Sequence, residues 1–318
     1  MLRAKQDLAG PKRAHGIMFH HFHDKKHVRG QGAISADQLG QVIDCYERDH
    51  NVLSAEEWMG RAIKDTLAED DVCLTFDDTL LCQYEVALPV LEDYKRTAFW
   101  FVYSSVLVGE IEELEVYRKF RTVFFEEIGD FYGAFFLTLS RSEYHEGVES
   151  SLERFSPEEY LGDFSFYSAE DRRFRYVRDV ALGVERYYSV MNLLMNEYNI
   201  DIDEFSSDLW MREHQIKNLR SRGHVIGLHS HSHPTALAAL PTAGQEREFR
   251  LNFDILSRIL DEKPQAMSHP CNSYNKETFS ILDRLGIKIG FRSNMAQATS
   301  RLEFPREDHA NIMKRIRA

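Results

Sequence analysis

Short apolar runs that end at polar residues recur along this chain and restrict its fold more than any other feature. Several of these runs are continuous rather than alternating, which is typical of strands that are buried on both faces. Segments with helical spacing separate them, and this β-α-β-α order predicts an α/β protein with a mostly parallel sheet or barrel. In such folds the working residues lie at the carboxyl ends of the strands. The expected strands are residues 16–19, 72–76, 97–102, 224–228, 265–267 and 287–291, and the expected helices are residues 36–48, 84–94, 210–222, 246–260 and 276–285.

Residues 104–206 interrupt this rhythm, because no strand is expected there and helix signals accumulate. Ser156 to Glu159 predicts a helix start. Apolar residues spaced three and four positions apart from Phe174 to Tyr198 predict one long helix with a single apolar face. We interpret the stretch as a helical insertion, 104–206, into one discontinuous domain of residues 1–103 and 207–318. That face is expected to pack against neighbouring helices, and a substrate lid or a homo-oligomer surface is compatible with such packing.

Composition restricts the cellular setting and the partners. The chain has 39 Lys and Arg residues against 51 Asp and Glu, and its net charge of −12 argues against nucleic acid as a partner. No stretch approaches the roughly 20 apolar residues of a membrane span, and the N-terminal residues lack the apolar centre of a signal peptide. The four cysteines form no regular framework, as is typical of reduced thiols, and a pair between Cys73 and Cys82 is the alternative. These observations predict a soluble, cytoplasmic protein.

Two adjacent carboxylates, Asp77 and Asp78, follow the expected strand 72–76. Neighbouring side chains at a strand end point in different directions, so one acid can bind a metal while the other faces a substrate as a base. A turn or a helix cap is the alternative interpretation of such a pair. The pair by itself therefore leaves catalysis and capping open.

Three alternating histidines, His229, His231 and His233, follow the expected strand 224–228. Neutral imidazole is the commonest metal ligand, and a buried imidazole without such a role needs a hydrogen-bond partner. Two histidines and one carboxylate leave coordination positions open, which suits a catalytic zinc hydrolase or a non-haem iron oxygenase. A metal site is therefore expected here, and the Asp77/Asp78 pair is the obvious source of a base.

Two further segments lie at expected strand ends. The first contains His20, His21 and His23, and strand periodicity aims only one of His20 and His21 into the pocket at the strand ends. The second is the loop 268–275, which is centred on Pro270 and can aim backbone N–H groups at a substrate. An ordinary turn is the alternative for this loop.

Two motifs, in this order and each after an expected strand, resemble those of the polysaccharide deacetylases, the NodB-homology group also called carbohydrate esterase family 4. LTFDDT at residues 74–79 resembles T-F-D-D-G, and GLHSHSHP at residues 227–234 resembles G-x-H-[ST]-x-x-H-P. The resemblance covers roughly residues 14–103 and 207–295. It implies a distorted (β/α) barrel of the NodB-homology type, here with a helical insertion, and a metal-dependent sugar N- or O-deacetylase.

Carried over position by position, the resemblance implies a role for each motif residue. Asp77 matches the catalytic base, and Asp78, His229 and His233 match the ligands of a divalent metal. That metal is expected to be Zn²⁺, with Co²⁺ or Ni²⁺ as alternatives. His231 falls on a variable position and is not expected to be a ligand.

The remaining expected site residues come from the two further segments. Cys271 matches the residue that lends its backbone N–H to the oxyanion, and His269 is expected beside the substrate or oxyanion. In one branch of the family the first strand ends in Tyr-His, and that histidine is the general acid. Met18-Phe19-His20 resembles this sequence, so His20 is the expected acid.

The chain departs from the family pattern at three places. Thr79 replaces the glycine of T-F-D-D-G. Ser268 stands where many members have an arginine that pairs with the catalytic base, and His269 or Arg292 is a possible replacement. The C-terminal Leu-x-His of many members is missing, and His309 does not match it. This last departure strengthens the expectation that His20 is the acid.

Together these features predict a metal-dependent hydrolase that removes an N-acetyl or similar acyl group from a sugar. The sequence predicts no export signal, so the expected substrate and partner is a cytoplasmic sugar precursor and not a finished wall polymer. A nucleotide-linked, lipid-linked or other precursor in surface glycan biosynthesis fits this expectation. A catalytically impaired, glycan-binding protein on the same scaffold is the alternative. The iron oxygenase is a third hypothesis, for which bound iron and a reducible cosubstrate are the discriminating observations.

Overall fold

The structure is a computed structural model that describes residues 12–161 and 168–317. It divides the chain into two compact units: one runs to Glu112 and resumes at Asp208, and the other is Glu113–Ser207. The sequence places the start of the insertion at residue 104, whereas residues 104–112 lie with the first unit. Hydrogen bonds explain this difference, because the backbone N–H groups of Ser104 and Ser105 donate to the carbonyl of His231.

The first unit is built on an eight-stranded sheet in which every pairing is parallel. Its order is β7-β6-β5-β4-β3-β1-β8, and β2 pairs with the start of β3. Most of the strands are buried along their whole length, which agrees with the continuous apolar runs. The strands are β1 (His15–Phe19), β2 (Asn51–Val52), β3 (Asp71–Phe76), β4 (Ala98–Val102), β5 (Val225–Leu228), β6 (Ala266–Ser268), β7 (Ile289–Phe291) and β8 (Arg306–Asp308).

The sheet nearly closes into a barrel through the segment that precedes β8. The N–H of Phe304 donates to the carbonyl of Gly290 at 2.8 Å, and the N–H of Gly16 donates to the carbonyl of Pro305 at 2.9 Å. A Cβ added at Gly290 would lie 2.6 Å from the carbonyl oxygen of Leu302, so this close approach requires glycine. The predicted (β/α) barrel is therefore confirmed.

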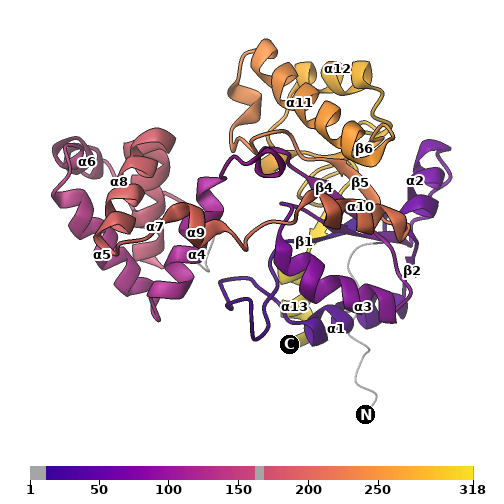
Figure 1. Ribbon diagram of the computed structural model, residues 1–318, viewed down its shortest axis with the longest axis horizontal. Helices are drawn as coiled ribbons and strands as arrows, with labels where there is room; N and C mark the ends of the chain where they lie inside the picture. Colours follow the sequence, from indigo (N-terminus) through magenta and orange to yellow (C-terminus); the bar gives the residue numbers. More distant parts are fainter. Residues whose placement is uncertain (1–11, 162–167, 318) are drawn as a thin grey trace. The chain divides into compact units, whose positions relative to one another are not determined.

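Helices surround the sheet of the first unit, with α1, α3 and α13 on one side and α11 and α12 on another (Figure 1). Helix α1 begins at a capping box formed by Ser35 and Gln38 and buries one apolar face. The helices are α1 (Ala36–Glu47), α2 (Ala55–Ile63), α3 (Leu88–Asp93), α10 (Glu213–Ser221), α11 (Thr242–Leu260), α12 (Lys276–Leu285) and α13 (His309–Arg317), with shorter turns η1 (Gln83–Ala87), η2 (Ser105–Val108), η4 (Leu237–Ala239) and η5 (Pro270–Asn272).

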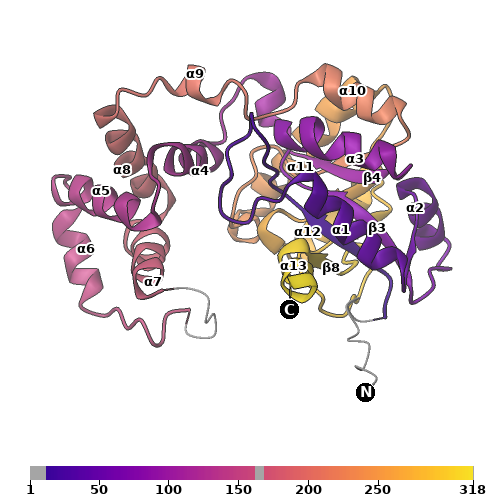
Figure 2. The same cartoon turned by 90° about the horizontal axis from the view of Figure 1, so that it is seen from below.

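The second unit is helical, as the sequence predicts for this stretch (Figure 2). Aromatic side chains from several helices form its core; the ring centroids of Phe135 and Phe174, for example, are 5.0 Å apart. No helix that the structure describes combines the length and apolar character of a membrane span. The elements are α4 (Glu113–Phe124), α5 (Ile128–Ser140), α6 (His145–Leu152), α7 (Ala169–Tyr176), η3 (Val177–Leu182), α8 (Gly183–Glu197) and α9 (Ile202–Ser206).

Two local predictions in this unit are wrong. The single long helix with one apolar face is divided into α7, the π-helical turn η3 and α8, with Gly183 at φ 70°. A π-helical turn contains more residues than an α-helical turn and therefore rotates the following helix face. Val184 is consequently 54% exposed, while Tyr187 and Val190 are buried. The predicted helix start at Ser156 is a turn, although its hydroxyl does accept from the N–H of Glu159.

Candidate metal centre and active site

Polar segments meet where several parallel strands end. Asp77 and Asp78 follow β3, His229 follows β5, and His269 follows β6. Because β1, β3, β4, β5 and β6 are successive neighbours in the sheet, these side chains reach one edge of the barrel. The sequence-predicted residues that the structure brings together here are His20, Asp77, Asp78, His229 and His233.

Asp78, His229 and His233 form a group whose ligand atoms all lie within 4.8 Å of one another. The Nε2 atoms of both histidines are 3.4 Å from Asp78 Oδ1. That oxygen is buried and has no hydrogen-bond partner among the described residues, which is costly unless another group satisfies it. Asp78 and His229 are nearly inaccessible to solvent. A divalent cation fits this donor set, because two imidazoles and one carboxylate leave coordination positions open.

Hydrogen bonds fix the orientation of His229. Its Nδ1–H donates to the carbonyl of Ser268 at 2.9 Å, which leaves the lone pair of Nε2 facing Asp78. Its backbone N–H donates to Asn252 Oδ1 at 3.0 Å, and Asn252 Nδ2 donates to the carbonyl of Val102. Helix α11 thereby holds the end of β5 against β4.

Glu248, also on α11, holds the following histidine loop. Its carboxylate accepts from the N–H groups of His231 and Ser232 at 3.0 and 2.8 Å and from the Ser232 hydroxyl at 2.9 Å. Sequence reasoning missed Glu248 and Asn252, because the loop contains no signal for a partner on a later helix. His231 is not among the metal-ligand group in the described chain; its Nδ1 lies 2.9 Å from Ser104 Oγ.

Charges around the triad act on the carboxylates and on His229. Burial alone raises the pKa of Asp78, but its close contact with His229 and the charge of His233 lower it well below its ordinary value. Burial alone lowers the pKa of His229, and Asp77 and Asp78 more than reverse that effect. The carboxylates are therefore ionised ligands and acceptors at neutral pH.

Arg306 on β8 is the partner of the predicted base. Both residues are buried, and Nη1 and Nη2 of Arg306 donate to the two oxygens of Asp77, each at 2.7 Å. Burial alone raises the pKa of Asp77, but the Arg306 charge and, after it, His229 lower it below its ordinary value. The Asp77 carboxylate is thereby held ionised and fixed in orientation.

This arrangement corrects the expected replacement for the family arginine, which is neither His269 nor Arg292. Arg292 contributes only its carbonyl, which accepts from Arg306 Nε at 2.8 Å. The Ser268 hydroxyl, at the position where many family members have an arginine, accepts from Arg306 Nη2 at 2.7 Å and lies 3.3 Å from Asp77 Oδ2. A serine at the end of β6 thus leaves room for an arginine from β8.

His20 lies beside both carboxylates and is partly exposed. Its Nε2 is 3.9 Å from Asp77 Oδ2 and 3.8 Å from Asp78 Oδ2. The buried Gln83, in the π-helical turn η1, donates through Nε2 to the carbonyls of His20 and Asp77 at 2.7 and 2.5 Å. The structure therefore places the predicted acid next to the predicted base, and Gln83 joins the two strand ends that carry them.

Cys271 and His269 occupy different environments. Cys271 is exposed, and no hydrogen bond of its N–H to another part of the described chain is seen. His269 is buried, stacks on Tyr274 at 4.0 Å and directs Nε2 to the carbonyl of Leu302. Burial lowers its pKa to about 3, and its place beside the substrate stays a prediction.

Left-handed backbone conformations gather at these loops. A non-glycine residue with positive φ is uncommon and costs free energy, so such residues persist where surrounding structure holds them. Thr79, which replaces the family glycine, has φ 59° and keeps the turn, and its hydroxyl donates to the carbonyl of Tyr103 at 3.3 Å. The left-handed residues of the three loops are Asp78, Thr79, Ser230, His233, Cys271 and Asn272.

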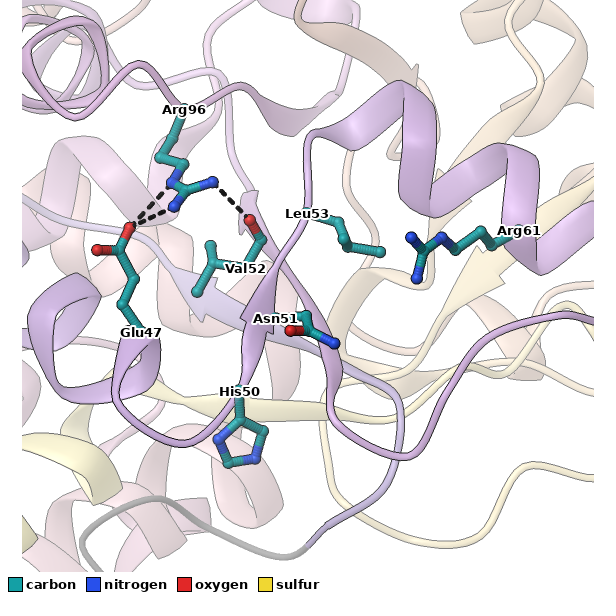
Figure 3. Close-up of a pocket in the computed structure, with 7 residues that line it drawn as sticks. All are labelled: Glu47, His50, Asn51, Val52, Leu53, Arg61 and Arg96. Carbon is teal, nitrogen blue, oxygen red and sulfur yellow. Dashed lines mark hydrogen bonds and ion pairs between the residues drawn. The ribbon is translucent and has the colours of Figure 1, made fainter.

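A cavity of about 460 Å³ lies elsewhere, where β2 pairs with the start of β3 (Figure 3). Both of its arginines are neutralised: Arg61 pairs with Asp71 at 2.8 Å and Arg96 with Glu47 at 2.7 Å. It contains no cluster of metal ligands within the described chain. The strand ends that carry Asp77 therefore remain the candidate site.

Comparisons with known proteins agree with this fold. The family model described as polysaccharide deacetylase matches residues 182–290, a range that contains His229, His233 and Cys271 but not Asp77. No curated protein matches the chain.

Three solved structures share the fold over most of this chain. The Streptococcus pyogenes deacetylase PplD, in complex with acetate, is 17% identical with a TM-score of 0.55, over 96% of this chain and 98% of that one. A de-N-acetylase from Aggregatibacter actinomycetemcomitans is 14% identical with a TM-score of 0.54, over 95% and 98%. The putative polysaccharide deacetylase BA0330 from Bacillus anthracis is 10% identical with a TM-score of 0.53, over 96% and 69%. The family match and the shared fold confirm the resemblance predicted from the motifs, to the polysaccharide deacetylase family.

Proposed function

We propose that this protein is a metal-dependent hydrolase that removes an N-acetyl or similar acyl group from a sugar. One observation carries the proposal: the ligand atoms of Asp78, His229 and His233 lie within 4.8 Å of one another, directly beside the buried Asp77–Arg306 pair. A divalent cation bound by the three ligands would supply a Lewis acid that polarises the acyl carbonyl and makes water more acidic. Zn²⁺ is the proposed metal, with Co²⁺ or Ni²⁺ as alternatives.

The residues of the chain divide the remaining chemistry. Asp77, ionised and held by Arg306, accepts a proton from the attacking water. The N–H of Cys271, in the turn after β6, is the proposed donor to the oxyanion, and no hydrogen bond from it to another element of the described chain is seen. His20 donates a proton to the departing amine, which leaves poorly without one.

The substrate we propose is a nucleotide-linked, lipid-linked or other sugar precursor in surface glycan biosynthesis, handled in the cytoplasm. The four cysteines are free thiols in the structure, which is compatible with a reducing compartment. The catalytically impaired glycan-binding protein is the second candidate. The retained Asp77–Arg306 pair disfavours it, because binding alone has no evident need for an ionised base beside the triad.

The test measures metal content and acetate release. Wild type is expected to bind about one equivalent of metal, whereas His229→Ala and Asp78→Asn lose it and His214→Ala, a histidine on the exposed face of α10, retains it. Asp77→Asn is expected to keep the metal and to lose turnover of N-acetyl sugars by a factor of roughly 10² or more. Absence of metal from wild type after reconstitution, or full activity of Asp77→Asn, would contradict the mechanism.

A further inference from the structure

The two chain segments that lead into and out of the helical unit are both attached to the metal-ligand loops. The entry segment begins at Tyr103, directly after β4, and the exit segment ends near Trp210, directly before α10. All of the contacts that follow lie within the first unit, on either side of residues 113–207.

The entry segment is bonded to the histidine loop. The N–H groups of Ser104 and Ser105 donate to the carbonyl of His231 at 3.1 and 2.9 Å, and Ser104 Oγ lies 2.9 Å from His231 Nδ1. The ring of Tyr103 packs against the ring of His233, with centroids 5.4 Å apart. A displacement of this segment therefore moves the loop that carries the ligands.

The exit segment is bonded to the loop that follows the aspartate pair. The N–H of Met211 donates to the carbonyl of Thr79 at 2.8 Å, and the N–H of Leu81 donates to the carbonyl of Leu209 at 2.8 Å. Trp210 and Leu80 form an antiparallel bridge between these bonds. The exit segment thus extends the backbone ladder of the loop that positions Asp78.

A side-chain hydrogen bond joins the two segments. Trp210 Nε1–H donates to the hydroxyl of Tyr103, and both side chains are buried. The carbonyl of Tyr103 also accepts from the Thr79 hydroxyl at 3.3 Å. Tyr103 therefore contacts His233 in the histidine loop and Thr79, which directly follows Asp78. The hydrogen bond from Trp210 joins Tyr103 to the exit segment.

We propose that Tyr103 and Trp210 are positioning residues that clamp the two metal-ligand loops together across the ends of the helical unit. The clamp sets the separation of Asp78 from His233. A displacement of either segment would therefore change the geometry of the metal site. This inference rests on the proposed function, because the ligand set is the one assigned above. Residues that do not bind a metal but orient its ligands commonly have a large effect on metal affinity.

The experiment measures the affinity of the full-length chain for Co²⁺ by competition with a chelator, together with the visible spectrum of the bound Co²⁺. Tyr103→Phe keeps the ring against His233 and removes only the hydroxyl, whereas Trp210→Phe replaces the buried indole with a smaller ring that has no donor. Each is expected to weaken Co²⁺ binding by about 10-fold or more and to shift the spectrum. Because both break one connection, the double variant is expected to be no weaker than the more affected single variant.

Matched controls separate positioning from general loss of stability. Tyr46→Phe removes another buried tyrosine hydroxyl, which donates to Glu307 at 2.6 Å, and Trp58→Phe removes another buried indole. Both controls are expected to bind Co²⁺ within about twofold of wild type after an equal or larger drop in melting temperature. Hydrogen exchange provides a second measurement: Co²⁺ is expected to slow exchange in peptides covering residues 104–112 and 208–211 of wild type, and less so in Trp210→Phe.

Unchanged Co²⁺ affinity in both single variants would overturn the clamp. Equal losses of Co²⁺ affinity in the two control variants, or additive losses of Co²⁺ affinity in the double variant, would overturn it as well. Failure of wild type to bind Co²⁺ is a separate result, because it contradicts the proposed function itself. Binding by wild type with no effect of the variants contradicts only the clamp.

Discussion

Replacement of Arg306 by methionine is expected to leave Asp77 as a buried carboxylate without its counter-charge. In the wild type, Arg306 Nη1 and Nη2 each donate to Asp77 at 2.7 Å, while further bonds reach the Ser268 hydroxyl at 2.7 Å and the Arg292 carbonyl at 2.8 Å. Removal of one partner from such a buried pair typically costs about 3–5 kcal/mol. For a unit of this size, that corresponds to a drop in melting temperature of roughly 10 °C.

The loss should depend on pH, because it arises from the charge of Asp77. In the wild type the pKa of Asp77 is lowered, so its contribution to stability is present above its unfolded pKa of about 3.9 and is lost as the pH falls. In Arg306→Met the pKa of Asp77 rises, and protonation then relieves the penalty. The difference in free energy of unfolding between the variant and wild type should therefore be smaller at pH 4.5 than at pH 7.5.

Urea denaturation of the metal-free proteins at the two pH values measures this difference, and the pH profile of kcat/KM measures its consequence for catalysis. The acidic limb, which reports the base of the free enzyme, should move to higher pH in Arg306→Met. Arg220→Met is the control, since Arg220 pairs with Glu262 and Glu56 at the surface and should change stability by less than about 1 kcal/mol. A pH-independent loss of under about 1 kcal/mol in Arg306→Met, or an unmoved acidic limb, would refute the reasoning.

Three further changes test separate parts of the structure. His20→Gln should lower turnover of an N-acetyl sugar by roughly 10²-fold or more. Turnover of an activated aryl acetate should fall much less, because its aryloxide leaving group needs no proton. Equal losses on both substrates would contradict the role of His20 as the acid. Glu248→Leu removes the acceptor of three hydrogen bonds from the histidine loop and should weaken metal binding by about 10- to 100-fold in a chelator competition. Glu248→Gln should weaken metal binding less. Wild-type metal affinity in both variants would contradict the view that α11 positions this loop. Asp261→Gly at the left-handed C-cap of α11 should stabilise the protein by up to about 1 kcal/mol in urea denaturation, whereas Asp261→Ala should not, and equal effects would argue against backbone strain there.

The departures from prediction have specific causes. β8 is absent from the sequence prediction because Arg306-Glu-Asp308 is charged, and a buried strand is normally expected to be apolar. Its charges are neutralised only in the folded barrel, Arg306 by Asp77 and Glu307 by Arg315. The face of α8 was misplaced because a π-helical turn leaves no periodic signal before the chain is folded.

The candidate metal-ligand loops can be predicted from the sequence alone. Continuous apolar runs predict strands that are buried on both faces, and polar residues that directly follow such a run lie at the end of the strand. Asp77, Asp78, His229 and His233 were therefore recognisable from spacing and from the family motifs.

The tertiary structure decided which side chains support those loops. Arg306 lies 229 positions from Asp77 and meets it only because β8 pairs with β1 beside β3. His269, one residue after β6, turns instead to the carbonyl of Leu302. Local spacing acts over a few residues, whereas these contacts depend on strand order and barrel closure, so the long-range partners of the base and ligands appear only once the sheet is assembled.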